Sequence, residues 1–164
     1  AVLGGLILIA AIVGMTRPRG HEAVTRAEYA RPPGEVWQVI SDFNHWTEWN
    51  PEIQGVEPLP DRNGHRVVNV KSSWGTAPTE FSVWEAPTRL RSDMNAGSFT
   101  GSWTYELAPT ASGGTLLTVT ERGEVGNPLY RTMMIFHDNY ETMISFHHAL
   151  AKRLGVSVEP VRVE

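Results

Sequence analysis

The chain of 164 residues contains no cysteine, and this absence excludes three kinds of chemistry. The protein cannot form a disulfide, use a thiolate as a nucleophile or bind a metal ion through cysteine ligands. Basic residues are not in excess either, because the chain has 14 lysine and arginine residues and 18 aspartate and glutamate residues. A surface that binds nucleic acid needs a basic patch or stripe, so the composition argues against a nucleic-acid partner.

Signatures of common catalytic sites are also absent from the sequence. There is no glycine-rich phosphate loop, no catalytic serine motif and no closely spaced pair of carboxylates. His137, Glu141 and His148 share one side of a helical stretch, but about 10 Å along the helix axis separates Glu141 from His148. One metal ion would not be held by both residues. We therefore predict no metal site and no cofactor, and the sequence favours a protein without enzymatic activity.

Charged side chains are missing from the first 15 residues, which are almost entirely apolar. Crossing a bilayer takes roughly 20 apolar residues, so this run is short unless residues precede it or the bilayer is thinned locally. We predict a single-pass transmembrane anchor over residues 1–16 and a linker over residues 17–20. A cleaved signal peptide and a buried core helix are the alternatives. Arg17 and Arg19 follow the run, and the positive-inside rule then favours a cytoplasmic position for the rest of the chain.

What the sequence does contain is a succession of short strand patterns. Apolar and polar residues alternate from His21 to Ala30. Pro32 and Pro33 then start a helix, and a second short helix over residues 44–49 ends at Pro51. Further strand patterns, separated by turn residues, cover residues 54–59, 65–74, 79–85, 89–94, 101–108 and 115–122.

The last part of the chain carries the strongest helical pattern. Neither proline nor glycine occurs from Leu129 to Leu154, while Pro128 suits a first helical turn and Gly155 stands where a C-terminal cap belongs. One side of this stretch is apolar and the opposite side is polar. The sequence therefore predicts one long amphipathic helix laid across a sheet, in a fold of the α+β class.

Four segments of the chain resemble the START-like (SRPBCC) superfamily of polyketide cyclase/dehydrase and lipid-transport proteins. They are the helix start at residues 32–37, the corner at residues 43–51 with its two tryptophans, the strand at residues 114–120 and the last helix. The resemblance implies a helix-grip fold, in which a curved antiparallel sheet of about seven strands wraps around a long C-terminal helix. It covers residues 21–155 and leaves residues 156–164 as a tail. A membrane segment before such a domain is also similar to an arrangement found in this superfamily.

A sheet curled around one helix leaves an apolar hollow, and hollows lined by aromatic residues are common small-molecule sites. The side chains expected to line it are Trp46, Trp49, Trp74, Phe81, Val83, Trp103, Tyr105, Met133, Phe136, Tyr140, Met143 and His147. Trp46 and Trp49 would stand at its mouth. The alternative is that these residues simply fill the core, and the sequence leaves that choice open.

His147 is the residue of the apolar stripe whose ordinary pKa lies close to neutral pH. It could face the cavity as a hydrogen-bond donor or a general acid and base, with Tyr105 or Tyr140 as its partner. The alternative is a core histidine that a neighbouring carbonyl satisfies. Glu121 lies two residues after Val119 and four after Leu117, so its side chain is expected on the same side of the strand. It either points inward or is solvated at the strand end.

These features lead to three hypotheses about function. The first is a membrane-anchored module that binds a hydrophobic small molecule, such as a lipid, an isoprenoid or a quinone, without chemistry. The second is an accessory subunit of a membrane protein complex, for which the apolar residues Met134 and Ile135 lie off the helical stripe. The third is an enzyme similar to the aromatase/cyclases, with His147 as its weak candidate for a catalytic residue.

Overall fold

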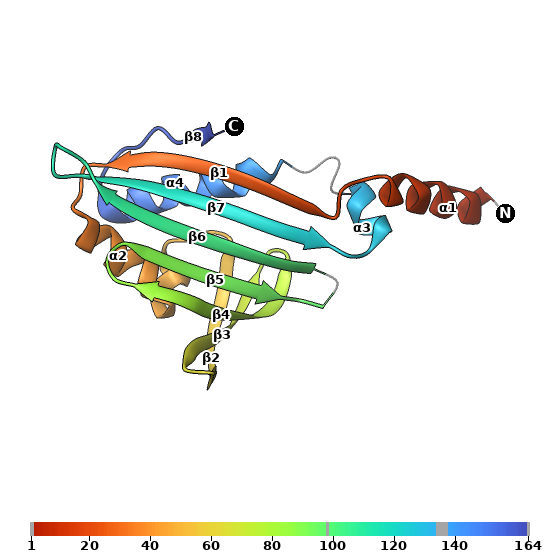
Figure 1. The fold of residues 1–164 in the computed structure, drawn as a ribbon, viewed down its shortest axis with the longest axis horizontal. Coiled ribbons are helices and arrows are strands. Elements are labelled where there is room, and N and C mark those ends of the chain that lie inside the picture. The colour runs from red at the N-terminus through yellow and green to blue at the C-terminus, as the bar shows by residue number, and fades with distance from the viewer. Residues whose placement is uncertain (1, 98, 134–137, 164) are drawn as a thin grey trace.

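The computed structural model describes residues 2–97, 99–133 and 138–163 and contains an eight-stranded antiparallel sheet (Figure 1). The strands are β1 (Gly20–Tyr29), β2 (Ile53–Arg62), β3 (His65–Ser72), β4 (Gly75–Glu85), β5 (Arg89–Asn95), β6 (Phe99–Pro109), β7 (Thr115–Val125) and β8 (Val161–Val163). Their order in the sheet is β2-β3-β4-β5-β6-β7-β1-β8. The predicted α+β class and helix-grip-like fold are confirmed, with eight strands in place of about seven.

Two short helices follow the first strand, as the resemblance implies. They are α2 (Pro33–Ser41) and the 3-10 helix η1 (Phe43–Glu48), and Pro33 occupies the first turn of α2. Trp46 lies buried at the corner after α2, and its indole N–H donates a hydrogen bond of 3.1 Å to the main-chain oxygen of Ile40. The corner is therefore anchored by a large apolar side chain whose polar atom is satisfied.

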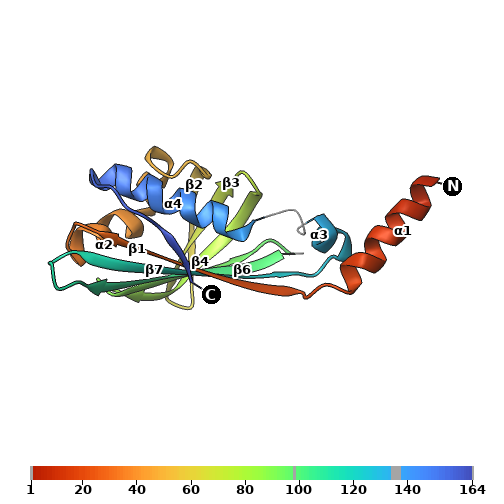
Figure 2. The same cartoon turned by 90° about the horizontal axis from the view of Figure 1, so that it is seen from above.

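Apolar and polar residues alternate along β1, and this alternation shows which side of the sheet is covered. Ala23, Thr25, Ala27 and Tyr29 are buried, while Glu22, Arg26 and Glu28 between them are exposed. Helix α4 (Asn139–Leu154) lies along the buried side, as Figure 2 shows. We call this side of the sheet the α4-side face and the opposite side the outer face.

The predicted long C-terminal helix is not observed as one element. Helix α3 (Pro128–Met133) precedes α4, which has 16 residues, and Asp138 before α4 has an extended backbone. The Asp138 carboxylate accepts a hydrogen bond of 2.9 Å from the main-chain N–H of Tyr140. Asp138 is thus an N-terminal cap, which a helix running through it could not use. Phe136 lies outside the described residues, as do Met134, Ile135 and His137.

The predicted transmembrane anchor over residues 1–16 is wrong, and the single-pass membrane localisation is wrong with it. Helix α1 (Val2–Met15) has 14 residues, or about 21 Å of helix against the roughly 30 Å of a bilayer core. Within the part of the chain that the structure describes, no helix combines the length and the apolar character needed to cross a membrane. The cytoplasmic orientation inferred from Arg17 and Arg19 depended on this anchor, so it is no longer supported.

Helix α1 packs instead against α3 at the end of the sheet (Figure 1). The Thr132 hydroxyl donates a hydrogen bond of 2.6 Å to the main-chain oxygen of Ala10. Gly14 makes a closer contact, because a side chain at this position would overlap the main-chain oxygen of Pro128. A residue without a side chain is therefore required where the two helices touch.

Candidate functional site

The α4-side face holds two cross-strand rows that lie near one end of the sheet. The first row consists of His21, Gly123, Gly101 and Met94, and the second of Ala23, Glu121, Trp103 and Ser92. Directly paired residues of an antiparallel sheet point to the same side. Thr25 of the next row contacts His147 of α4, so all three rows belong to the α4-side face.

Glycines in the first row make room for aromatic rings against the sheet. Gly101 and Gly123 are cross-strand partners. A side chain at Gly123 would overlap the ring of His21, and one at Gly101 would lie 3.1 Å from the ring of Phe99. Both rings can therefore rest on a part of the sheet that carries no side chains.

A small pocket lies between these two rows. Its volume is about 30 Å³, and its lining consists of Ser92, Met94, Phe99, Gly101, Ser102, Trp103, Glu121 and Arg122. A space of this size holds a water molecule rather than a ligand. The open cavity expected from the sequence is thus mostly filled by side chains in the part of the fold that the structure describes.

A larger open hollow of about 910 Å³ lies at the same end of the sheet, mainly on the outer face. The charged residues of its lining belong to that face, among them Glu22, Arg62, Glu80, Arg91, Asp93 and Glu124. The hollow and the small pocket share Met94, Gly101, Ser102 and Arg122, because these residues belong to the strands that separate the two spaces.

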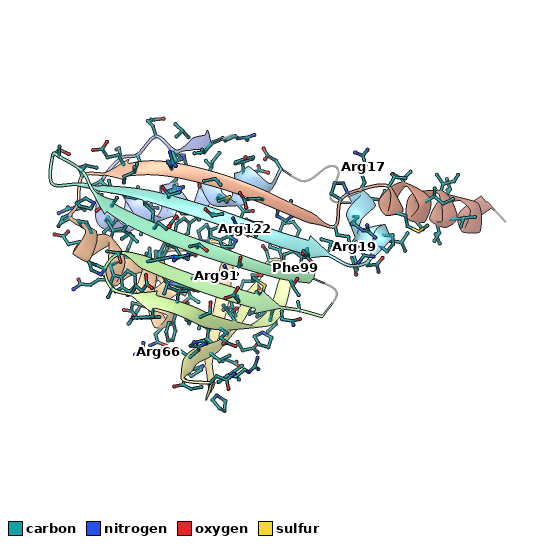
Figure 3. All side chains as sticks on the ribbon, viewed as in Figure 1. Arg17, Arg19, Arg66, Arg91, Phe99 and Arg122 are labelled. Atoms are coloured by element: carbon teal, nitrogen blue, oxygen red, sulfur yellow. The ribbon has the colours of Figure 1, made fainter. Side chains whose placement is uncertain are left out.

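The charged residues of the outer face are arranged in pairs. Arg122 bonds to Glu22, and the Arg91 guanidinium donates a hydrogen bond of 2.7 Å to Asp93. Figure 3 labels Arg91 and Arg122 on strands β5 and β7, with α4 behind the sheet. Burial alone would raise the pKa of the Asp93 carboxyl, but the Arg91 guanidinium and the Ser82 hydroxyl outweigh it, so the pKa is lowered. This face is therefore a charged surface in which cations and carboxylates neutralise one another.

His21 and Glu121 form a polar pair on the α4-side face. The distance from His21 Nε2 to Glu121 Oε1 is 3.1 Å, and 21% and 16% of the two side chains are exposed. Glu121 lines the small pocket and His21 lines the open hollow. Burial, with a smaller effect from the negative charge of Glu121, raises the pKa of Tyr105, so the Tyr105 phenol stays protonated.

Aromatic rings fill the space between the second row and α4. Phe146 of α4 has its ring centre 5.7 Å from that of Trp49, 5.7 Å from that of Trp103 and 5.5 Å from that of Tyr105. These separations are favourable for edge and offset contacts between rings. Trp49 and Trp103 are half-buried, so this cluster reaches from the core to the edge of the pocket.

His147 lies deeper, between α4 and β1, with no exposed surface. Its Nε2 is 3.0 Å from the Thr25 hydroxyl and its Nδ1 is 2.8 Å from the Tyr29 hydroxyl, which also donates to the main-chain oxygen of His147. A neutral ring satisfies both contacts, with Nδ1–H donating to Tyr29 and Thr25 donating to Nε2. Burial, with a smaller effect from His148, lowers the pKa of His147 to about 4. The ring is therefore a satisfied core group that contacts β1.

The predicted cavity residues are distributed over several environments. Phe81 and Met143 are buried in the core, Trp46 is buried at the corner, and Tyr140 is half-buried beneath the guanidinium of Arg162. Trp74 lies in the turn between β3 and β4 with 66% of its surface exposed. Met133 ends α3.

A β-bulge in β4 moves Val83 away from the position expected of it. The pairing register shifts between Phe81 and Val83, so Val83 pairs with Arg91 while Phe81 pairs with Ser92. Arg91 pairs with Thr104, which lies on the outer face, so Val83 also points there. Trp84 takes the inward position in its place and packs on Trp37 and Phe81.

Reasoning from the sequence missed three residues of this region: His21, Trp84 and Phe146. His21 shares the phase of Ala23 and Thr25, so the alternation in β1 already pointed it inward. Only the pairing of β1 with β7 brings it to Glu121. No group of histidine, aspartate and glutamate side chains suited to a metal ion occurs among the residues with described positions.

Comparison with known proteins gives a clear result for the fold. A family model described as "Polyketide cyclase / dehydrase and lipid transport" matches residues 20–141. No curated protein matches the sequence. Among solved structures, the Zhui aromatase/cyclase from Streptomyces sp. R1128 is similar, with a TM-score of 0.71, 15% identity and coverage of 83% of this chain and 94% of that one.

Two further structures show the same similarity. A START superfamily protein from Mycobacterium smegmatis has a TM-score of 0.62 at 20% identity and covers 82% of this chain and 97% of its own. Truncated norcoclaurine synthase from Thalictrum flavum has a TM-score of 0.65 at 13% identity, with coverage of 85% and 97%. At these identities the similarity concerns the fold alone.

Proposed function

Because the chain belongs to the polyketide cyclase/dehydrase and lipid transport family, we propose that it binds a hydrophobic small molecule and does not transform it. The proposed site is the end of the α4-side face that contains the small pocket. Met94, Phe99 and Trp103 supply its apolar lining.

The observation that carries this proposal is the lining of the small pocket on the α4-side face. Met94, Phe99 and Trp103 line it together with the polar side chains of Ser92 and Glu121. Small-molecule sites usually have a mostly apolar lining with a few polar groups. The pocket has a volume of about 30 Å³, so a ligand has to displace side chains to enter it. Met94 adds adaptability, because a methionine side chain can repack around ligands of different shape.

The state of His147 supports binding without chemistry. Both of its ring nitrogens are engaged by Thr25 and Tyr29, and its pKa of about 4 leaves it neutral at physiological pH. A general acid and base needs a pKa near the working pH and access to the substrate. The role of the remaining predicted cavity residues, Trp46 and Trp49 included, stays a prediction.

The two other functions considered from the sequence have less support. A subunit role rested on the predicted anchor, which is wrong, and on the apolar residues Met134 and Ile135, which lie outside the described part of the chain. An aromatase/cyclase-like activity draws on the names of similar structures, which share at most 20% identity with this chain in the cases described above.

The proposal is tested with N-phenyl-1-naphthylamine, a neutral apolar probe whose fluorescence rises on transfer out of water. We expect saturable binding to the protein, and Trp103→Ala should weaken it about tenfold, because an aromatic contact contributes about 1.4 kcal/mol. Trp84→Ala is the matched control, since Trp84 packs at another part of the face.

Both variants are first compared with the parent protein by thermal unfolding. The proposal is rejected by an absence of saturable binding, or by equal losses of affinity in the Trp103 and Trp84 variants.

A further inference from the structure

Half of helix α1 extends beyond the rest of the molecule. Figure 2 shows that α3 lies beside the part of α1 that is next to the sheet, where Thr132 bonds to Ala10 and Gly14 contacts Pro128. Residues 4–9, which we call the projecting half of α1, are exposed on every side of the helix. The fold of one chain therefore covers α1 over only part of its length.

The exposed surface of α1 is entirely apolar. Residues 2–15 include no polar or charged side chain. The large side chains of the projecting half are between 51% and 62% exposed, and they are Leu6, Ile7, Leu8 and Ile9. The apolar surface continues over Leu129 and Tyr130 of α3, which are 38% and 51% exposed. A helix that is apolar on all sides is normally buried, so this surface indicates a partner.

Charge is confined to one end of α1. Arg17 and Arg19 are exposed, and Figure 3 labels both where α1 joins the sheet. Two α1 helices packed in parallel would bring these arginines together. Antiparallel packing places the arginines of one copy about 20 Å from those of the other, or about two Debye lengths, where salt screens their repulsion.

Antiparallel packing also brings together surfaces that complete one another. Because the direction of the second α1 is reversed, the half that carries its α3 lies beside the projecting half of the first. Leu129 and Tyr130 of each copy then cover the projecting half of the other copy. Both contacts are the same by two-fold symmetry, which is the usual geometry of a homodimer.

The size of this surface suits a dimer. Helix α1 has 14 residues, so at about 10 Å across it has a lateral surface of about 650 Å². Two such helices, together with the exposed side chains of α3, offer the roughly 1,000 Å² that a specific interface needs. Burial of apolar surface of this extent stabilises an association.

We propose that α1 and α3 form a homodimer interface, in which the α1 helices of two copies pack antiparallel and the projecting half of each lies against α3 of the other. The partner is thus a second copy of this chain. This inference goes beyond the proposed function and does not depend on it, because the small pocket and its lining residues take no part in the argument.

Sedimentation velocity of the whole chain in buffer without detergent tests the oligomeric state. We expect a species of twice the 18.2 kDa chain mass that dissociates on dilution. Leu8→Glu should raise the dissociation constant at least about 100-fold, because both copies lose a buried leucine and gain a charge. Leu116→Glu is the matched control, since Leu116 is an exposed leucine on β7, and its dissociation constant should equal that of the parent protein.

Thermal unfolding shows that the variants fold. The Tm of the parent protein should rise with protein concentration, because the dimer is linked to the folded state, whereas the Tm of Leu8→Glu should not depend on concentration. Leu8 is 62% exposed within one chain, so the substitution leaves the core of the protomer intact.

Spin labels measure the direction of packing, and the absence of cysteine makes each label specific to its site. In an antiparallel pair, the two copies of Leu8→Cys should lie about 10 Å apart, because residue 8 is near the middle of α1. The two copies of Met15→Cys should lie about 20 Å apart, because residue 15 ends the helix. A parallel pair would bring both positions to about 10 Å.

Four results would overturn the proposal: a monomer at every concentration, a dimer that Leu8→Glu leaves unchanged, equal weakening by Leu116→Glu, or a short distance at both labelled positions. A chain that is monomeric in buffer and binds phosphatidylcholine vesicles through Leu8 would assign the apolar surface to lipid, and it would overturn the proposal as well. None of these results bears on the binding of the fluorescent probe, so the proposed function is tested separately.

Discussion

At the scale of single residues, four histidines of this chain differ in the groups that they contact. His45 and His65 contact carboxylates near the surface, and His21 contacts Glu121 at the edge of a pocket. His147 alone among these four has no exposed surface, and its partners are two hydroxyl groups. A hydroxyl partner satisfies a neutral ring but does not compensate for a positive charge, which is why burial controls the pKa of His147.

This environment predicts how stability depends on pH. The pKa of His147 is about 4 in the folded protein and 6.5 in an unfolded chain, so the unfolded state binds the extra proton first as the pH falls. The contribution of His147 to the free energy of unfolding is complete above pH 6.5. It is lost between pH 6.5 and 4, by about 3 kcal/mol in total.

Urea unfolding at a series of pH values measures this loss, and His147→Gln should show a shallower dependence over the same interval. His45→Gln serves as the comparison variant, because it makes the same substitution at a histidine whose side chain is 55% exposed. An NMR titration of the parent protein checks the cause independently. A pKa of His147 near 6.5 in the folded state would contradict the explanation.

At the scale of elements, the break before α4 shows how a capping residue overrides a helical pattern. Asp138 accepts from the main-chain N–H of Tyr140 and also bonds to the guanidinium of Arg162, at 2.6 Å. Glu141 follows three residues later, which is the spacing of a capping box. The apolar stripe continued through this position, so periodicity gave no indication that a helix begins here.

The cap leads to a prediction about α4. Asp138→Ala should lower the free energy of unfolding by about 1 kcal/mol, because the first turn of α4 loses a side-chain acceptor. Asp138→Asn is the matched control, since asparagine keeps the acceptor and removes the charge that faces Arg162. Chemical denaturation measures the free energy of unfolding of both variants. Equal losses in both variants would mean that the ion pair, and not the cap, is responsible.

At the scale of the whole molecule, one sheet has two surfaces of different character. The α4-side face is apolar and aromatic beneath α4, and it ends in the pocket that contains Trp103 and Glu121. The outer face carries ion pairs such as that of Arg91 with Asp93. The proposed ligand site lies on the α4-side face at one end of the sheet, and Ser92 and Glu121 are polar residues of its lining.

Ligand binding at this place should stabilise the whole fold. A ligand at a concentration 100 times its dissociation constant adds about 2.7 kcal/mol to the free energy of unfolding, which corresponds to a rise in Tm of about 5–10 °C. Thermal unfolding with and without N-phenyl-1-naphthylamine measures the shift. Trp103→Ala should reduce it and Trp84→Ala should not. A shift of equal size in all three proteins would place binding somewhere other than the proposed site.

Local sequence patterns were enough to predict the α+β class and the order of the elements from β1 to β7. Alternation in β1, the prolines before α2 and the tryptophan corner are local signals, and each depends on neighbouring residues only. These signals also carried the resemblance to the superfamily that the family model confirms. They failed for the anchor, because apolar character without length does not make a span.

Tertiary structure decided which of these residues meet. His21 and Glu121 are 100 residues apart and come together only through the register of β1 with β7. One bulge exchanged Val83 for Trp84 on the α4-side face, since a shift of one residue reverses the direction of every following side chain. Register and bulges arise from pairing between distant segments. The local pattern of the sequence therefore predicted the fold, and only the folded sheet brought the candidate site together.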